Sequence, residues 1–509
     1  MKKNRPRKIT WVTQFAYGSG NLLGSGALAI SGVWLLYFYT TFCGLSVVEA
    51  TLIFSVATYL DVILNPIMGF VTDGFYQTKL GKKFGRRRFF IMIGIPLMLV
   101  YPMLWVNHMN FWYYLSTYVA FEIIYNSVMI PYETLAVEMT TDFNKRTYLT
   151  GSKAVFGKIA NFLAAAIPGF FIGSLGQDSP LSFFYTGLVY SIIMMVSLTL
   201  LYFNSWERPY EEVKTEFVGN TWESIKKLFI DILSTFRIRT FRHHMGMYLF
   251  GFGAEWLFAA VFTYFVVFVL QRPAEFVSGM NSLSSILQLI STAIFIAICV
   301  KKGFTKPFIW ALSVVILAVI LYSAVYFLHI QNLTWLIIGI TVLFGIGTGG
   351  VYYIPWSVYT FMADVDEVVT NRRREGVYAG AMTMAGKLVR ASVISILGLV
   401  LSHYGFKSGA NIQPESAINA ILGILIIGVA GLAIIGVYFS NKMKLNHETH
   451  QIVLAEIDRI HNGGRMENVS SKTKEVIEQL TGFPYEKCFG NNSVGYQGKG
   501  QMDLQKKIN

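Results

Sequence analysis

An aspartate stands inside an apolar run of the chain, between Thr51 and Val71. The run is long enough to cross a bilayer as a helix, where an ionisable side chain costs ~2.5–3.5 kcal/mol on insertion. Asp61 shares a helix face with Asn65, four residues later, and with Thr58, one turn earlier. Three oxygen-bearing side chains on one face predict a path for a cation or a substrate. The alternative is an aspartate that only pairs with a cation elsewhere in the bundle.

Further polar side chains recur in the other apolar runs. Thr383, Lys387 and Arg390 lie at i, i+4 and i+7, so they form one stripe on a helix. Cations inside a membrane need anions, carbonyls or water, and Asp61 is one natural partner. We expect the remaining candidates to be either substrate contacts or structural groups that form ion pairs or fill the core; they are Lys158, Asn126, Glu133, Tyr353 and Trp356, with Glu122 beside them. For Glu255 a structural ion pair is the expected role.

The sequence contains no motif that is typical of an enzyme active site. There is no Walker loop, which argues against transport driven directly by ATP. No nucleophile with a base and an orienting group stands out, and the cysteines Cys43, Cys299 and Cys488 are too scattered for a metal site. The sequence therefore predicts a protein that is not an enzyme and that needs no cofactor beyond a coupling ion.

The composition is that of a polytopic membrane protein. Hydrophobic residues make up 54% of the chain and charged residues 14%. The net charge of +13 is explained by basic cytoplasmic loops, so it does not call for a nucleic-acid partner. We expect membrane lipid to surround the chain.

Apolar runs separated by short polar breaks predict about twelve transmembrane helices and no strands. We place them at residues 14–42, 46–72, 89–107, 111–135, 151–175, 182–204, 244–270, 278–300, 306–329, 334–363, 375–403 and 415–440. Lys and Arg gather in one set of loops, while the opposite loops hold only Arg272 and Lys407. The positive-inside rule then puts both termini and the long link at 205–243 in the cytoplasm.

The two halves of the chain resemble each other. Ile130-Pro131-Tyr132 precedes Gly157-Lys158 in the first half, as Ile354-Pro355-Trp356 precedes Gly386-Lys387 in the second. Parallel six-helix repeats are typical of the all-α major facilitator fold, in which substrate binds between the halves near mid-membrane. The predicted parts are an N-terminal half at 1–204, a cytoplasmic linker at 205–243, a C-terminal half at 244–440 and a cytoplasmic tail at 441–509.

Several of these motifs, taken together, resemble the glycoside–pentoside–hexuronide:cation symporter family of the major facilitator superfamily, to which melibiose permease belongs. They are Tyr17-Gly18-Ser19-Gly20, Gly44-Leu45-Ser46, Asp61 with Asn65-Pro66, Met362-Ala363-Asp364-Val365-Asp366, and Thr383 with Lys387. The resemblance covers residues 12–440. It implies that Asp61 matches the first of two aspartates that bind the coupling cation, whereas Asn65 replaces the second. Thr383 and Lys387 match residues at and near that cation site.

Departures from the family pattern point to an anionic substrate. The family's galactoside-binding aspartates are replaced by Ser25 and Met129, while Lys387, Arg390 and Lys158 remain. A cavity with excess positive charge attracts carboxylates. The overall pattern is most similar to the oligogalacturonide transporters of pectin-degrading bacteria. It implies import of oligogalacturonides or related uronate sugars, coupled to H⁺ or to Na⁺, with Asp61 as the metal ligand in the sodium case.

Two alternatives stay open. One is a symporter of a neutral glycoside or pentoside, and the other is a non-transporting membrane sensor that signals through its tail. In either transport hypothesis the expected location is the bacterial cytoplasmic (inner) membrane, with a small carbohydrate as substrate and a monomer as the working unit.

Overall fold

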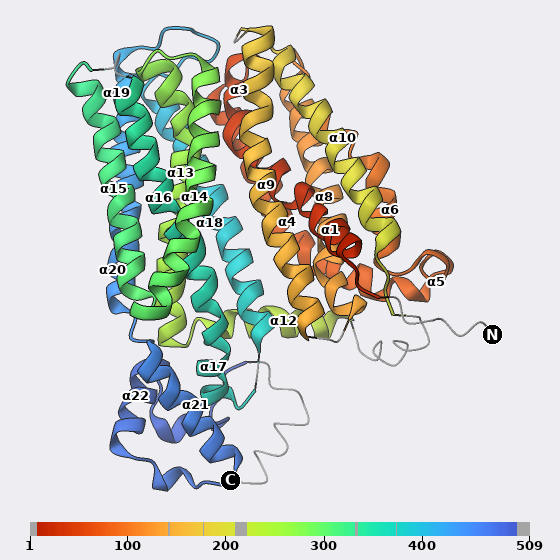
Figure 1. Cartoon of the computed structure of the whole chain (residues 1–509), viewed down its shortest axis with the longest axis vertical. Coiled ribbons are helices and arrows are strands. Elements are labelled where there is room, and N and C mark those ends of the chain that lie inside the picture. Colours follow the sequence, from red (N-terminus) through yellow and green to blue (C-terminus); the bar gives the residue numbers. More distant parts are fainter. Residues whose placement is uncertain are drawn as a thin grey trace. The chain divides into compact units, whose positions relative to one another are not determined.

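The structure is a computed structural model that describes residues 8–140, 143–176, 178–208, 221–330, 334–372 and 374–495. Every regular element in this part of the chain is helical, as Figure 1 shows. The chain divides into two compact units. Unit 1 comprises Met1–Val218, Trp256–Ile286 and Ala391–Leu425, and unit 2 comprises Gly219–Glu255, Leu287–Arg390 and Ile426–Asn509.

The first six predicted spans correspond to helices at nearly the predicted positions. The first is continuous from Trp11 to Thr41 and includes α1 (Trp11–Ser19), α2 (Leu28–Ile30) and α3 (Leu36–Thr41), joined by π-helical turns. The others are α4 (Val47–Gly74), α6 (Arg88–Leu97) with α7 (Val100–Met103), α8 (Phe111–Met139), α9 (Phe143–Leu175) and α10 (Leu181–Asn204), with the short α5 (Lys79–Phe84) between α4 and α6.

The later spans also match the predicted positions, and the described part of the tail contains two further α-helices. The spans are α13 (Arg239–Tyr264), α14 (Ala274–Lys302), α15 (Thr305–Phe327), α16 (Thr334–Val358), α18 (Glu375–His403) and α19 with α20 (Glu415–Gly423, Gly431–Lys442). Outside them lie α12 (Thr221–Thr235) in the linker, α17 (Met362–Thr370), and the tail helices α21 (His447–His461) and α22 (Ser471–Thr481).

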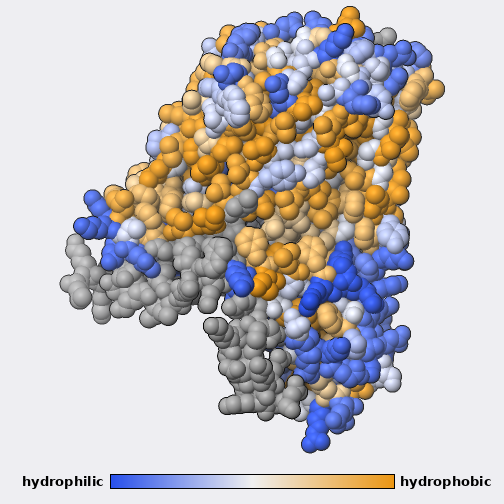
Figure 2. Space-filling view, turned by 180° about the vertical axis from the view of Figure 1, so that it is seen from behind, coloured by the Kyte–Doolittle hydropathy of each residue, from blue (hydrophilic) through white to orange (hydrophobic). Residues whose placement is uncertain are grey.

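Among the described residues, nine helices are long and apolar enough to cross a membrane. The helices α4 and α8, with 28 and 29 residues, also exceed the roughly 20 residues that a bilayer requires. Figure 2 shows one face of the molecule on which hydrophobic side chains cover much of the helical surface. The prediction of an all-α membrane protein is confirmed.

The predicted helix at 89–107 is wrong in one respect, because it is broken in two. Pro96 lies inside α6 and removes a backbone donor. The chain then tightens, with the Leu99 amide bonding to the Pro96 carbonyl at 3.2 Å, before α7 resumes at Val100. A proline in a membrane helix is tolerated where such local adjustments satisfy the freed backbone groups.

Close packing of the first helix rests on glycine. A Cβ on Gly26 would lie 1.5 Å from the hydroxyl oxygen of Tyr190 and 3.2 Å from the Cβ of Ala160. The same hydroxyl donates to the Leu22 carbonyl at 2.8 Å, so the first helix packs directly against α9 and α10. Small residues of this helix therefore allow the close approach of its neighbours.

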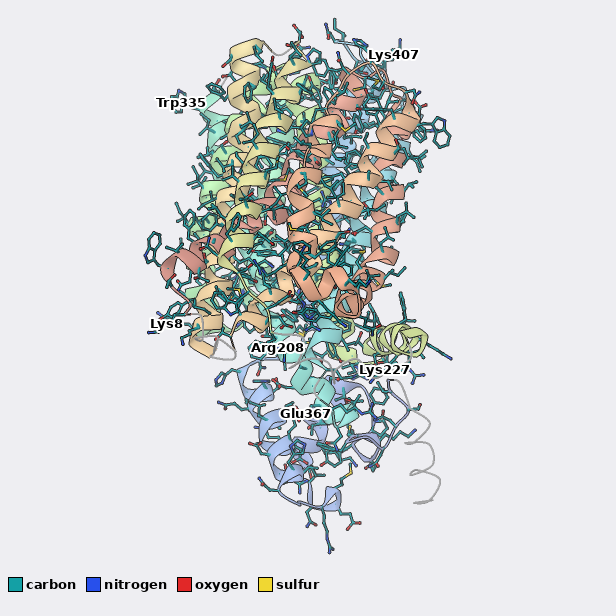
Figure 3. All side chains as sticks on the ribbon, turned by 90° about the vertical axis from the view of Figure 1, so that its right-hand side faces the viewer. Lys8, Arg208, Lys227, Trp335, Glu367 and Lys407 are labelled. Carbon is teal, nitrogen blue, oxygen red and sulfur yellow. The ribbon has the colours of Figure 1, made fainter. Side chains whose placement is uncertain are left out.

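Within each unit, the labelled side chains of Figure 3 mark opposite ends. In unit 1, Lys407 lies at one end, while Lys8 and Arg208 lie at the other. In unit 2, Trp335 lies at one end, and Lys227 and Glu367 lie at the other. Lys8 and Arg208, two basic residues of the predicted cytoplasmic side, thus share an end of unit 1, away from the loop that holds Lys407.

Candidate functional site

The candidate cation site lies in unit 1, where α4 packs against α8. The Asp61 side chain of α4 is 3% exposed, and Asn126 of α8 is 2% exposed. The Asn126 amide donates a hydrogen bond to Oδ1 of Asp61 and another to the Glu122 carbonyl, at 2.8 Å. The Glu122 side chain, one turn earlier on α8, is also buried. A buried carboxylate is thus held by an amide from the neighbouring helix.

Local sequence explains why α4 and α8 take these positions. The helix α4 begins at a capping box, in which the Ser46 hydroxyl accepts from the Glu49 amide and the Glu49 carboxylate accepts from the Ser46 amide. On α8, the Tyr125 hydroxyl donates to the Gly24 carbonyl of the first helix at 2.8 Å. Asn126 is the next residue after this anchor, so its register toward α4 is fixed by a buried tyrosine.

Hydroxyl groups join α4 to the second part of α18, which also belongs to unit 1. The hydroxyls of Ser55 and Ser395 are hydrogen-bonded to each other, and Ser55 also contacts the Ala391 carbonyl at 3.3 Å. A Cβ on Gly398 would lie 2.2 Å from the Thr51 hydroxyl, so the two helices approach closely there. Sequence reasoning missed this hydroxyl pair, because serines in apolar runs give no signal that distinguishes pairing from packing.

The other candidates of the N-terminal half have varied surroundings. Thr58 is half-buried, and its hydroxyl donates to the Phe54 carbonyl at 2.7 Å. Half-buried Ser25 packs against α9, since a Cβ on Gly157, beside Lys158, would lie 3.2 Å from its hydroxyl. Glu133 forms an exposed ion pair with Lys153, at 3.0 Å. Lys158 is half-buried, and the side chain of Asn65 lies outside the described part of the structure.

In unit 2, the predicted cationic stripe follows α18. Lys387 and Arg390 are half-buried and Thr383 is exposed, with its hydroxyl donating to the Ala379 carbonyl at 2.9 Å. The stripe faces a tightly packed neighbour, because a Cβ on Gly386 would lie 2.3 Å from the Tyr248 hydroxyl of α13. Asp61 belongs to unit 1, whereas these residues belong to unit 2.

The aromatic candidates of α16 have different neighbours, and Trp356 lies beside the same tyrosine. The Trp356 ring is 5.8 Å from the Tyr248 ring in an edge-on arrangement. The Tyr353 hydroxyl accepts a hydrogen bond from Ser357 at 3.3 Å. Trp356 is 36% exposed, so its ring is available to a ligand as well as to neighbouring side chains.

Beyond α16, unit 2 carries a buried ion cluster that includes Asp366, the last residue of the motif Met362-Ala363-Asp364-Val365-Asp366. Arg374 donates to Asp366 at 2.6 Å and to Asp231 of α12 at 3.2 Å. Burial acts against the charged guanidinium, but its hydrogen bond and charge interaction with Asp366 are stronger, and the pKa of Arg374 is raised. The cluster joins α17, α12 and the start of α18.

A comparable cluster lies in unit 1. Glu138, at the end of α8, accepts from Arg86 at 2.5 Å, from Arg87 at 2.8 Å and from Arg208 at 3.0 Å. These arginines belong to the basic loops from which the cytoplasmic side was predicted. The Glu138 carboxylate thus pairs with arginines that lie just before α6 and after the end of α10.

Within the residues that the structure describes, no group of three or more His, Cys, Asp or Glu side chains is placed to hold a metal ion. A cation at Asp61 would therefore rely on amide, hydroxyl or carbonyl oxygens for its other ligands. Hard cations such as Na⁺ bind oxygen ligands of these kinds. A proton on the carboxylate needs no further ligand.

These features define a polytopic helical membrane protein with ionisable side chains inside its helices. The chain belongs to the family described as MFS/sugar transport protein, which matches residues 16–444. It is 21% identical to the isoprimeverose transporter of Lactiplantibacillus pentosus, over 89% of this chain and 92% of that protein. It is 19% identical to the glucuronide carrier protein homolog of Escherichia coli (strain K12), over 89% and 96%. Among solved structures, a D-xylose-proton symporter matches with a TM-score of 0.58 at 14% identity, over 85% and 96%.

Proposed function

We propose that this protein is a secondary carrier that imports a uronate sugar, such as an oligogalacturonide, together with H⁺ or Na⁺. The observation that carries the coupling role is the buried Asp61, held by the Asn126 amide between two helices. An ionisable group inside a membrane bundle marks an ion path by default, because burial without function is costly. Binding of a proton or a cation neutralises this carboxylate and lets the helices rearrange.

The uronate substrate is supported by the charges of α18. Lys387 and Arg390 are half-buried cations within a membrane-spanning helix. With Lys158 they favour an anion, since charge pairing is strong where water is scarce. Ser25, Asn126, Glu133, Tyr353 and Trp356 remain proposed sugar contacts, and Thr58, Asn65 and Thr383 remain proposed neighbours of the cation. The relative named as a glucuronide carrier homolog agrees with a uronate.

The arrangement in the membrane follows from the basic loops. We propose two six-helix halves, at 1–204 and 244–440, joined by the linker 205–243 and followed by the tail 441–509. Both termini face the cytoplasm of a bacterial cell, across its inner membrane. The shared end of Lys8 and Arg208, opposite Lys407, supports this orientation for unit 1. The carrier works as a monomer by alternating access.

A second candidate is a symporter of a neutral glycoside or pentoside. The relative named as an isoprimeverose transporter favours it, because isoprimeverose carries no charge. The cations of α18 would then pair with protein carboxylates rather than with substrate. A non-transporting sensor is the third hypothesis, and substrate binding without counterflow would favour it.

The test is uptake of labelled trigalacturonate into proteoliposomes, with pH and sodium gradients imposed separately, for the wild type and for Lys387→Ala. Uptake driven by one gradient and lost in the variant would support the substrate class, the ion and the role of Lys387 together. If neither gradient drives uptake while a neutral glycoside is accumulated, the second candidate replaces the first.

A further inference from the structure

Four polar side chains from four helices of unit 2 lie at a similar depth. They are Glu255 of α13, Gln288 of α14, Tyr352 of α16 and Arg390 of α18. Glu255, Gln288 and Arg390 lie in the middle third of the spans Arg239–Val269, Ala274–Lys302 and Gly376–His403. Tyr352 lies in the second half of α16. Placing polar groups deep in a membrane span costs free energy. Four such groups close together therefore indicate a functional role.

Contacts and electrostatic interactions join the four helices at this level. The Gln288 amide donates to Oε1 of Glu255 at 3.2 Å, which joins α14 to α13. The Tyr352 ring lies 5.5 Å from the Phe252 ring, and its hydroxyl interacts electrostatically with both Glu255 and Arg390. Glu255, Gln288 and Tyr352 thus lie close together, and the charge of Arg390 acts on the Tyr352 hydroxyl. We call these four side chains the mid-span cluster.

Small residues bring the backbones together around the mid-span cluster. A Cβ on Gly349 would lie 1.9 Å from the Ser291 hydroxyl, where α16 meets α14 one turn from Tyr352 and Gln288. A Cβ on Gly253 would make ordinary van der Waals contact with Val389, at 3.7 Å, so α13 and α18 are neighbours beside Glu255 and Arg390. The cluster is thus set on rigid, closely packed helices.

The chemistry of the cluster differs between its two sides. A carboxylate only accepts hydrogen bonds, and its two oxygens match the paired hydroxyls of a sugar ring. A guanidinium only donates, and it matches a carboxylate. Gln288 is 9% exposed and donates to the Glu255 carboxylate, whereas Tyr352 is 36% exposed, so on this side of the cluster the tyrosine is the residue that a ligand contacts first.

We propose that the mid-span cluster is a sugar-binding subsite in which Glu255, positioned by Gln288, accepts hydroxyls of the substrate and Tyr352 adds a further hydroxyl contact. Arg390, on the other side, takes the carboxylate of the same sugar. This inference rests on the proposed function and adds a hydroxyl-recognising part to it. It also replaces the purely structural role that the sequence favoured for Glu255.

The experiment measures discrimination rather than activity alone, because a structural ion pair would also lower activity when broken. Uptake of labelled trigalacturonate into proteoliposomes is inhibited with galacturonate and, separately, with its monodeoxy analogues. A site that hydrogen-bonds a hydroxyl rejects the analogue that lacks it, by roughly tenfold or more. In the wild type we expect at least one analogue to inhibit about tenfold less well than galacturonate.

The measured ratio is the inhibition constant of an analogue divided by that of galacturonate. In Glu255→Gln this ratio should fall toward one for the analogue that the wild type rejects. Tyr352→Phe keeps the ring on Phe252 and removes only the hydroxyl, so it should lower the ratio for a different analogue or by a smaller factor. Ser323→Ala is the matched control, since the Ser323 hydroxyl of α15 is buried and donates within its own helix at 3.0 Å. It should leave every ratio unchanged.

Unchanged ratios in folded Glu255→Gln and Tyr352→Phe would overturn the subsite. If Glu255→Gln does not insert into the membrane, the same inhibition ratios are measured in Gln288→Ala and Tyr352→Phe, and unchanged ratios in both would overturn the subsite. If the wild type ignores trigalacturonate but accumulates isoprimeverose, the uronate substrate fails. The cluster is then tested with deoxy analogues of that neutral sugar, and Arg390→Gln should no longer affect affinity. A wild type that transports neither sugar would overturn both proposals.

Discussion

The Asn126 amide of α8 donates a hydrogen bond to the Asp61 carboxylate of α4, and both side chains are almost completely buried. The pair connects two helices at the only aspartate of the apolar run Thr51–Val71. A change in the charge of Asp61 therefore acts directly on the packing of α4 against α8. This is the type of contact through which ion binding can drive a conformational step.

Asp61→Asn should abolish coupling because the amide can take up neither a proton nor a cation. We expect gradient-driven accumulation to fall to the equilibrium level, while counterflow of the substrate without a gradient continues. Both are measured with labelled substrate in proteoliposomes. Asn204→Ala removes another helix amide, which donates to the Leu200 carbonyl at 2.9 Å, and should behave like the wild type. Full accumulation in Asp61→Asn would remove Asp61 from the coupling mechanism.

Gly26→Ala should destabilise the N-terminal helices because the new methyl group would overlap the hydroxyl of buried Tyr190. Overpacking of this kind typically costs about 1–3 kcal/mol. The midpoint of thermal unfolding in detergent should fall. Gly339→Ala on α16 is the control, since its methyl group would meet no atom within 4 Å. Its midpoint should stay the same or rise slightly, because alanine favours a helix over glycine. Equal midpoints for the two variants would contradict the close packing.

Much of the fold could be predicted from the sequence because each membrane helix is a local structure. A run of about twenty apolar residues forms its own backbone hydrogen bonds, so length and composition alone locate it. The break after Pro96 was missed, since a proline inside a membrane helix either kinks or is absorbed, depending on its neighbours. The helix α12 was missed because its contacts, such as that of Asp231 with Arg374, come from distant parts of the chain.

The candidate site was predictable only in part, for a related reason. Asp61 and Asn126 could be found from their cost inside apolar runs, but not their hydrogen bond, which depends on how α4 and α8 pack. Gln288 was missed because a single amide in a long apolar helix resembles ordinary polar variation. Its role depends on its hydrogen bond to Glu255, which is 33 residues away in sequence. A sequence pattern does not show which distant residues are in contact.

Acidification should loosen the tail through Glu456 of α21. Burial disfavours its charged form, but the hydrogen bonds from Arg459 and Tyr485 and the charge of Arg459 together outweigh burial, so the pKa of Glu456 is lowered. A carboxyl group with a lowered pKa contributes stability above its ordinary value of about 4.3, and this contribution is lost as the pH falls through the lowered value.

Hydrogen exchange of α21 and α22, measured at pH values from about 6 to 3, checks this expectation. Protection in the wild type should decrease at the acidic end by more than the chemical exchange rate explains. Glu456→Gln cannot titrate, so its protection should be lower near neutral pH and should change less with acidification. The same acid-dependent loss in both proteins would assign the effect to other groups.

Arg374→Ala should destabilise the cytoplasmic end of unit 2, since it leaves the fully buried Asp366 and its neighbour Asp231 without this cation. Removing one partner of a buried ion pair typically costs about 3–5 kcal/mol. The tail depends on the same region, because the Phe489 and Gly490 amides donate to the Val368 and Val369 carbonyls of α17 at 2.6 and 3.0 Å. Cleavage of the tail by a protease should therefore become faster in Arg374→Ala.

The matched control is Lys472→Ala, which breaks the exposed ion pair with Glu448 on the tail itself. Exposed pairs contribute little, so its cleavage rate should equal that of the wild type. The pair Arg374→Ala with Asp366→Asn should be less damaging than Arg374→Ala alone, because it no longer buries an uncompensated carboxylate. If the double variant is as unstable as the sum of the single variants, Arg374 and Asp366 act independently, and the cluster does not hold α17 for the tail.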